Sequence, residues 1–351
     1  MLRMSMYAHP HMRGSGSFFG YAYTFNEIQR HLKRYRVGGK PLQIDINNPK
    51  SKIQLDYGQP PGRFFNHQYK IQMTQWEATR VPAHWVDLSK GYNEWWTANH
   101  FGAQAMIDTG IPESKVHVYE HGIDSGVWSP TLRGQRDKIR FLHIDSASPR
   151  KRADLVVKAF KNVFGDNPDY ELTLKYSHGP MSKANWNNES VLANEGERDG
   201  NIRRIRDNLS LEDLVKLHHF HDIIIYPSEG EGFGLIPLQA LSTGMPVIST
   251  GRWCSYERFL NGNIIESTIG KSEISENYER HGNVVVPNHE STEFLMRQVA
   301  DDIENQSKAF FAQAPNVARD YNWQTLTNKT MESLVSRVGM DMFKPTKAFF
   351  N

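Results

Sequence analysis

Two stretches of the chain alternate short apolar runs with longer amphipathic segments. This alternation is typical of parallel strands connected by helices that cover the sheet. The expected β-α-β units are strand 2–8, helix 21–36 and strand 42–46 in the first stretch, and strand 139–144, helix 153–164 and strand 172–176 in the second.

The pattern is most regular between residues 223 and 249, which predict strand, loop, helix and strand in that order. Ile223, Ile224 and Ile225 form a β-branched run that ends before Pro227. Leucines then recur at helical spacing, and Gly244, two residues before a proline, is a helix stop signal. The loop between the first strand and the helix therefore lies at the carboxyl end of a buried strand.

This loop combines three glycines with two glutamates. Gly230, Gly232 and Gly234 leave main-chain N–H groups unshielded, and the following helix start adds unpaired donors. Glu229 and Glu231 would repel a bare phosphate but can accept hydrogen bonds from hydroxyl groups. The loop thus favours a ligand that carries both a sugar and a phosphate, and an ordinary turn with solvated glutamates is the alternative.

The stretch from Pro227 to Ile248 resembles the donor-site signature of the family-four retaining glycosyltransferases of GT-B fold, the glycosyl transferases group 1. The resemblance implies an α/β protein with two Rossmann-like domains facing a central cleft. It also implies sugar transfer from a nucleotide-sugar such as a UDP-sugar, with retention of configuration and with no metal or other cofactor. In the family one glutamate contacts the donor sugar and a second contacts the ribose. Glu231 matches the first, Gln239 stands at the second, and the expected backbone contacts are Gly232, Phe233, Gly234 and Leu235.

Three adjacent cations, Arg150, Lys151 and Arg152, precede the helix expected over 153–164. A helix dipole opposes cations at this end, so a bound diphosphate would explain them, whereas a solvated basic loop is the alternative. By resemblance Lys151 matches the diphosphate-binding lysine. The family arginine would fall near Ser146 and is missing, so Arg150 or Arg152 is expected to replace it. The expected catalytic residues are therefore Glu231, Lys151 and Arg150, with Arg152 in the donor site.

The resemblance also extends to the first half of the chain. It implies that a glycine turn with Gly122 and Asp124 reaches the donor, as does the first strand-to-helix loop with Gly14 and Gly16. Trp76 stands where the family often has a histidine, which leaves His67 and Glu77 as candidates for that role. The expected domains are 1–132 and 139–310, joined by a polar linker, and residues 311–351 are expected to form a helix and tail that pack back across both domains.

Composition narrows the class of protein. With 351 residues and a hydrophobic fraction of 38%, the chain is long enough for two domains with cores of their own. One cysteine excludes an intramolecular disulfide and a cysteine-rich zinc site. No apolar run approaches the roughly 20 residues of a spanning helix, so we expect a soluble, cytoplasmic protein. The histidines 218, 219 and 221 invite a zinc interpretation, but neighbours on a helix point apart, and we expect no metal site.

The net charge of +2 gives no global attraction to nucleic acid or membrane, so any such contact must be local. Cations do gather between Arg30 and Lys40. They suit a solvated helix end. The alternative is that they contact a nucleic acid or a membrane surface, which would favour DNA or a lipid-linked sugar as the acceptor, and a polysaccharide acceptor also stays open.

Three other functions stay open from sequence alone. A glycosyltransferase acting on a modified DNA base would use the cations and the aromatics of residues 60–96. A catalytically silent relative would bind the sugar nucleotide without turnover, as the neutral Gln239 suggests. An NAD-dependent enzyme would use Gly14, Gly16 and Gly20 with Asp45, which loosely imitate a dinucleotide fingerprint.

Overall fold

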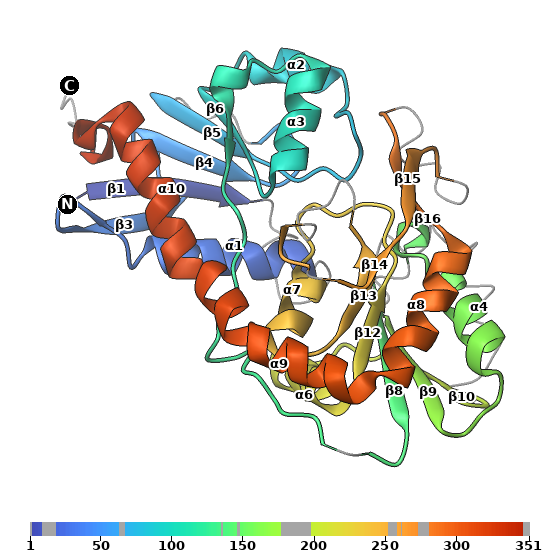
Figure 1. Ribbon diagram of the computed structural model, residues 1–351. Coiled ribbons are helices and arrows are strands. Elements are labelled where there is room, and N and C mark those ends of the chain that lie inside the picture. Colours follow the sequence, from blue (N-terminus) through green and yellow to red (C-terminus); the bar gives the residue numbers. More distant parts are fainter. Residues whose placement is uncertain are drawn as a thin grey trace. The chain divides into compact units, whose positions relative to one another are not determined.

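A computed structural model describes residues 2–8, 19–62, 67–134, 136–145, 148–176, 198–251, 258–260, 262–272 and 281–346. The chain forms two compact units (Figure 1). Unit 1 comprises residues 1–122 and 321–351, and unit 2 comprises residues 123–320. The first unit thus ends ten residues before the boundary expected at 132. The segment expected over 311–351 is divided, because its first ten residues belong to unit 2.

Unit 1 is built on a sheet of seven strands in the order β2-β3-β1-β4-β5-β6-β7. All neighbours are parallel except β2 and β3, which form an antiparallel hairpin. The order reverses beside β1, because β3 and β4 lie on its two sides. The strands are β1 Leu2–Ala8, β2 Arg36–Val37, β3 Lys40–Ile46, β4 Ile53–Tyr57, β5 Tyr69–Met73, β6 Glu94–Thr97 and β7 Val116–Val118.

Capping residues mark the ends of two helices in unit 1. Asn99 accepts from the Gly102 N–H at the start of α3, and Gly110 ends that helix in the left-handed conformation. Asn322 caps α10 in the same way, and α10 packs on α1 (Figure 1). The helices are α1 Phe19–Leu32, α2 His84–Ser89, α3 His100–Thr109 and α10 Trp323–Val338, with short 3₁₀ turns η2 Glu113–Lys115 and η7 Met340–Phe343.

The helix expected over 21–36 is wrong at its carboxyl end. α1 stops at Leu32, and the chain then forms the β2–β3 hairpin in which Arg36 pairs with Pro41. The cause lies in Gly38 and Gly39, whose φ angles of 55° and 76° form a tight turn that only glycines adopt easily. The cations expected on one helix are therefore divided between the end of α1, a turn and two strands.

Unit 2 has a second sheet of seven strands in the order β10-β11-β9-β8-β12-β13-β14. From β11 to β14 all neighbours are parallel, and the order reverses between β8 and β12. The strands are β8 Ile139–Asp145, β9 Tyr170–Tyr176, β10 Arg198–Asp199, β11 Ile202–Ile205, β12 Ile223–Tyr226, β13 Val247–Thr250 and β14 Ile264–Ile265, and a separate antiparallel pair is β15 Ser267–Gly270 with β16 Val284–Pro287.

The helices of unit 2 follow the amphipathic segments of the sequence. α4 occupies the expected residues 153–164 and buries Val156, Phe160 and Phe164 in one core with strand residues and α8. Ser210 caps α6 by accepting from the Asp213 N–H. α4 packs on α8, and α7 packs on α9 (Figure 1). The helices are η3 Pro149–Lys151, α4 Ala153–Phe164, α6 Leu211–Phe220, α7 Leu235–Ser242, α8 His289–Asp301 and α9 Ile303–Asp320.

Within these described ranges, no helix combines the length and the apolar character needed to cross a membrane.

Candidate active site

The candidate active site lies where the strand order of unit 2 reverses. In an open parallel sheet the loops after the two central strands diverge at this point and leave a crevice for a ligand. The loop after β8 carries Arg150, Lys151 and Arg152, and the loop after β12 carries Glu229 and Glu231. The topology therefore brings together two segments that are about eighty residues apart in the sequence.

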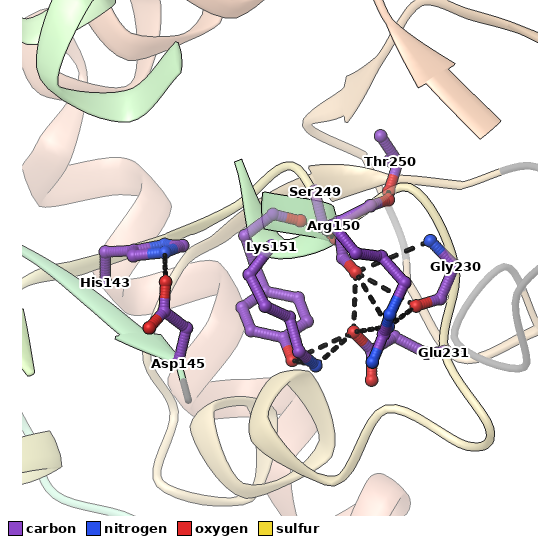
Figure 2. A network of polar contacts seen from close by, with 10 residues as sticks. His143, Asp145, Arg150, Lys151, Gly230, Glu231, Ser249 and Thr250 are labelled. Carbon is purple, nitrogen blue, oxygen red and sulfur yellow. Dashed lines mark hydrogen bonds and ion pairs between the residues drawn. The ribbon is translucent and has the colours of Figure 1, made fainter. Parts of the chain in front are cut away.

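One carboxylate oxygen gathers the polar groups of this site. Glu231 Oε1 accepts from Arg150 Nη1 at 3.0 Å and from the Lys151 ammonium (Figure 2). It also accepts from Tyr226 Oη at 3.1 Å and from Ser228 Oγ at 2.5 Å. No residue that the structure describes donates to the other oxygen, Oε2. Glu231 is thus fixed through one oxygen, while its second oxygen is free to accept.

The charged groups of the site shift the pKa values of one another. Burial by itself would raise the pKa of Glu231, but Lys151 and Arg150 lower it to about 2. Burial lowers the pKa of Lys151, an effect that Glu231 opposes and Arg150 reinforces. Lys151 also donates to Tyr226 Oη at 2.6 Å, and Arg150 donates to the Gly230 carbonyl. Two cations thus face one ionised carboxylate in a largely buried setting.

Arg152 lies beside this cluster in a different set of contacts. Its Nη1 donates to Glu229 Oε1 at 3.0 Å, and its Nε donates to Asp154 Oδ1 at 3.2 Å. Both members of the Arg152–Glu229 pair are buried, with 2% and 0% of their side chains exposed. The sequence placed Arg152 with the donor, whereas its guanidinium is engaged with Glu229 and Asp154.

The glycine-rich loop leads directly into α7. Gly234 is the N-cap of α7, with a φ of 92° that strongly favours glycine, and Leu235 is the first helical residue. Phe233 is buried and packs against Phe259. Gln239 is buried on α7, and its Oε1 has no hydrogen-bond partner. A ligand hydroxyl could satisfy this oxygen, and the expected ribose contact stays a prediction.

Sequence reasoning missed two residues that hold Glu231, namely Tyr226 and Ser228. Both flank Pro227 directly before the loop, so a strand that ends in polar side chains was the available signal. It also missed His143 and Asp145 at the end of β8, which lie beside Lys151 in Figure 2. His143 Nε2 lies 3.0 Å from Asp145 Oδ2, and His143 Nδ1 lies 2.9 Å from the Ile225 carbonyl.

The sites expected in unit 1 are less well supported by geometry. Gly14 and Gly16 lie outside the described residues. A side chain at Gly122 would begin 2.6 Å from the backbone nitrogen of Trp323, so packing alone explains this glycine. Asp45, the acid of the dinucleotide interpretation, lies 3.7 Å from Arg3 and accepts from Gln43.

His67, one of the two candidates for the family histidine role, makes a structural contact, and so does Trp76 at the position where the family often has the histidine. His67 is buried, and its Nδ1 lies 2.7 Å from the Ser51 carbonyl. Trp76 donates to the Arg80 carbonyl and packs edge-on against Trp85. None of these contacts assigns the role to either position.

Neutral groups line the carboxyl end of the unit 1 strands. Gln75 Nε2 donates to Tyr57 Oη at 3.2 Å and to His121 Nε2 at 3.1 Å. Tyr57 Oη also shares a hydrogen bond with Thr24 Oγ1. Burial lowers the pKa of His121 to about 3, so the ring is neutral and its Nε2 can accept. Nearby on β4, burial raises the pKa of Asp56 to about 6, even though Gln54 and Tyr92 donate to its carboxylate.

The three histidines considered for zinc bond to backbone carbonyls instead. His218 Nδ1 lies 2.8 Å from the Leu214 carbonyl, and His221 Nδ1 lies 2.7 Å from that of Leu217. Over the described ranges, no group of three or more His, Cys, Asp or Glu residues is placed to hold a metal ion.

The cations between Arg30 and Lys40 differ in their surroundings. Arg30 pairs with Glu27 at 2.5 Å, and His31 is buried next to Gln324. The exposed members are Lys33, Arg34, Arg36 and Lys40. The predicted contact with a nucleic acid or membrane stays a prediction.

Part of the chain matches a known family. Residues 128–263 match the family described as glycosyl transferases group 1. This segment contains the two loops of the candidate active site. The resemblance predicted for the chain is therefore confirmed.

Curated relatives agree with this class. The D-inositol 3-phosphate glycosyltransferase of Corynebacterium glutamicum is 29% identical over 160 residues, which cover 43% of this chain and 37% of that protein. The O-antigen chain mannosyltransferase B of Escherichia coli is 26% identical over 195 residues, covering 55% of this chain and 44% of that protein. The chain thus spans less than half the length of these relatives.

Solved structures resemble the chain over nearly its whole length. Anabaena HepE, in complex with UDP and glucose, has a TM-score of 0.65 at 12% identity and covers 96% of this chain and 100% of its own. Sucrose-phosphate synthase from Thermosynechococcus elongatus has a TM-score of 0.66 at 12% identity and covers 96% and 99%. The predicted GT-B fold, with two Rossmann-like α/β domains, is confirmed. The comparisons do not favour the NAD-dependent, DNA-modifying or silent alternatives.

Proposed function

We propose that the protein transfers a sugar from a nucleotide-sugar donor to an acceptor, with retention of the anomeric configuration. The observation that carries the proposal is the convergence of Arg150 and Lys151 on Glu231 at the switch point of unit 2. Cations at this position match the negative charge of a sugar diphosphate, and a carboxylate with one free oxygen matches a sugar hydroxyl.

The proposed chemistry follows from the charge that the reaction develops. When the bond between the sugar and the diphosphate breaks, negative charge grows on the leaving oxygens. Lys151 and Arg150 would stabilise that charge, and they would exchange part of their contact with Glu231 for contact with the diphosphate. Glu231 would stay held by Tyr226 and Ser228, and its Oε2 would orient the donor sugar. Since two side-chain cations supply the positive charge, we propose that no divalent metal is needed.

The nucleotide would extend from the diphosphate toward α7. The main-chain groups of Gly232, Phe233 and Gly234 would contact the donor, and the unpaired Gln239 Oε1 would accept from a ribose hydroxyl. HepE was solved with UDP, which makes UDP-sugars the first donors to test. The proposal leaves the acceptor open, and a lipid-linked sugar, a polysaccharide and DNA are the candidates.

A binding screen tests the proposal. Melting temperatures are measured with UDP-, GDP- and ADP-sugars and with NAD, in the presence and absence of EDTA, for the wild type and Lys151→Ala. A ligand that binds only the folded state raises the melting temperature. The expected result is stabilisation by one class of nucleotide-sugar, unchanged by EDTA and lost in Lys151→Ala. Stabilisation by NAD alone would overturn the proposal.

Retention is tested separately from binding. Release of the free nucleotide from the identified donor is followed with a panel of sugar acceptors, and the anomeric configuration of the new product is read by NMR. An unchanged configuration is expected. Binding of the donor without any nucleotide release would instead identify a silent sugar-nucleotide-binding protein.

A further inference from the structure

Arg152 adopts a backbone conformation that residues other than glycine rarely take. Its φ and ψ angles are 58° and 41°, in the left-handed region, and it stands between η3 and the first residue of α4. A glycine would occupy this position without steric strain. Strain of this kind persists only where the surroundings overdetermine it, and it is often found at functional sites.

The contacts of the Arg152 side chain hold its backbone in this conformation. Its guanidinium donates to Glu229 and to Asp154, and Nη2 lies 3.5 Å from His289 Nε2. Glu229 is fully buried, and its second carboxylate oxygen accepts from Ser272 Oγ. The pair therefore crosses from the loop after β8 to the loop after β12, as the Glu231 contacts also do.

The backbone of Glu229 ties the same two loops together. Its N–H donates to the Arg150 carbonyl at 2.9 Å, and its carbonyl accepts from the Val285 N–H at 2.8 Å. The Arg152 N–H closes the η3 turn on the Pro149 carbonyl at 2.9 Å. The position of the Arg150–Lys151 backbone therefore depends on the residues at both ends of the Arg152–Glu229 pair.

We propose that the Arg152–Glu229 ion pair is a positioning device, which holds the turn so that Arg150 and Lys151 face the donor diphosphate. Arg152 does not itself contact the donor. This inference rests on the proposed function and replaces the expectation that Arg152 belongs to the donor-binding set. The physical reason is that a buried charge needs its partner, so removing one member leaves the other uncompensated and drives the loop to rearrange.

A double-mutant cycle with UDP, GDP and ADP as probes tests this inference. The variants are Arg152→Gly, Glu229→Gln and the double variant Arg152→Gly/Glu229→Gln, and the dissociation constant of the nucleotide is measured for each. Arg152→Gly relieves the backbone strain but leaves Glu229 unpaired. We expect each single variant to weaken binding by about tenfold or more. The double variant is expected to return to within about threefold of the wild type.

The cycle separates positioning from direct contact. If Arg152 touched the diphosphate, the double variant would bind as weakly as Arg152→Gly, because neutralising Glu229 restores no phosphate contact. If the pair served stability alone, the single variants would melt earlier while their folded forms bound the nucleotide as the wild type does. Either result overturns the inference.

A control variant and a substitute for Arg152→Gly complete the experiment. Asp154→Asn removes the more exposed partner of Arg152 and leaves Glu229 in place, so its nucleotide affinity is expected to stay within about twofold of the wild type. If Arg152→Gly fails to fold, Arg152→Lys takes its place, and the combination Arg152→Lys/Glu229→Gln is expected to bind more weakly than Arg152→Lys because a buried cation then loses its anion. A wild type that binds none of the three nucleotides contradicts the proposed function itself. Wild-type binding with failed rescue contradicts only the positioning role.

Discussion

The two sheets place very different chemistry at the carboxyl ends of similar strands. In unit 2 these ends carry buried charges that are paired across the two loops, Arg150 and Lys151 with Glu231 and Arg152 with Glu229. In unit 1 the corresponding ends carry neutral groups in a hydrogen-bonded chain through Tyr57, Gln75 and His121. One architecture thus supports paired buried charges in one unit, and in the other a neutral hydrogen-bonded chain with the buried carboxyl of Asp56 near it.

This difference determines which chemical groups of a ligand each unit can bind. The two cations that face Glu231 in unit 2 can share their contacts between this carboxylate and a phosphate, so that neither anion is left unpaired. A neutral hydrogen-bonded edge offers nothing to an anion but is compatible with hydroxyl groups. Removing a cation of unit 2 should therefore impair binding of the donor. Removing the charge of Asp56 in unit 1, which burial disfavours, should instead raise the stability of the protein.

The largest expected effect comes from removing Lys151, one of the cations at the carboxyl ends of the unit 2 strands. Lys151→Ala should lower the rate of nucleotide release from the donor by about 10² to 10³, the usual cost of losing one group that stabilises developing charge. The measurement is the steady-state rate with the identified donor. Lys158→Ala, which changes an exposed lysine on the following helix α4, is the control and should keep the wild-type rate. Equal rates in both variants would remove Lys151 from the proposed site.

In unit 1, removing the charge of Asp56 should be favourable and should stabilise the protein. Because burial raises the pKa of Asp56 to about 6, the folded state binds this proton more tightly than the unfolded chain does. The associated stability is present below about pH 4 and is lost as the pH rises through about 6. Asp56→Asn should therefore stabilise the protein at pH 7, by up to about 3 kcal/mol.

Denaturant unfolding of the wild type and Asp56→Asn across the pH range 4 to 8 checks this prediction. The difference in the free energy of unfolding should be largest at pH 7 to 8 and should fall to about 0.5 kcal/mol at pH 4, where the folded carboxyl is neutral and the unfolded one is still partly ionised. A constant difference across this range would mean that Asp56 is not the titrating group.

A smaller effect is expected from Tyr226→Phe. The change removes a hydroxyl that accepts from Lys151 and donates to Glu231, but both charges and their direct contact remain. Nucleotide release should fall by about tenfold, corresponding to about 1.4 kcal/mol for one lost hydrogen-bonding group. Tyr176→Phe, whose hydroxyl accepts from Arg206 at 2.8 Å, offers a comparison at another strand end of the same sheet. A loss as large as that of Lys151→Ala would indicate that Tyr226 takes a direct part in the chemistry.

The smallest effect is expected at the neutral edge. Gln75→Ala breaks two hydrogen bonds of the chain in unit 1 and should lower the free energy of unfolding by about 1 kcal/mol. Nucleotide affinity should change by less than about twofold, because the groups proposed to hold the nucleotide lie in unit 2. Titration of the variant with UDP measures this affinity. A large loss would show that the neutral edge also takes part in binding the nucleotide.

The sequence alone determined the features that depend on neighbours along the chain. The period of apolar residues located α4 at residues 153–164. Helix starts are equally local, because the side chains of Asn99, Ser210 and Asn322 each cap N–H groups only two or three residues away. The order of these elements, together with the signature after Pro227, was enough for the GT-B fold. Even the error at the end of α1 was local, because Gly38 and Gly39 carry the turn signal that the cation-rich helix pattern obscured.

Only the tertiary structure decided which charges meet. Arg150, Lys151 and Arg152 are adjacent in sequence and look alike as three cations. The first two turn to Glu231, while Arg152, in its left-handed conformation, turns to Glu229. This division depends on the reversal of strand order between β8 and β12, which brings loops about eighty residues apart into contact. Sequence spacing cannot express such pairing, because the energy of a buried ion pair depends on distance and burial, and only the folded chain fixes these.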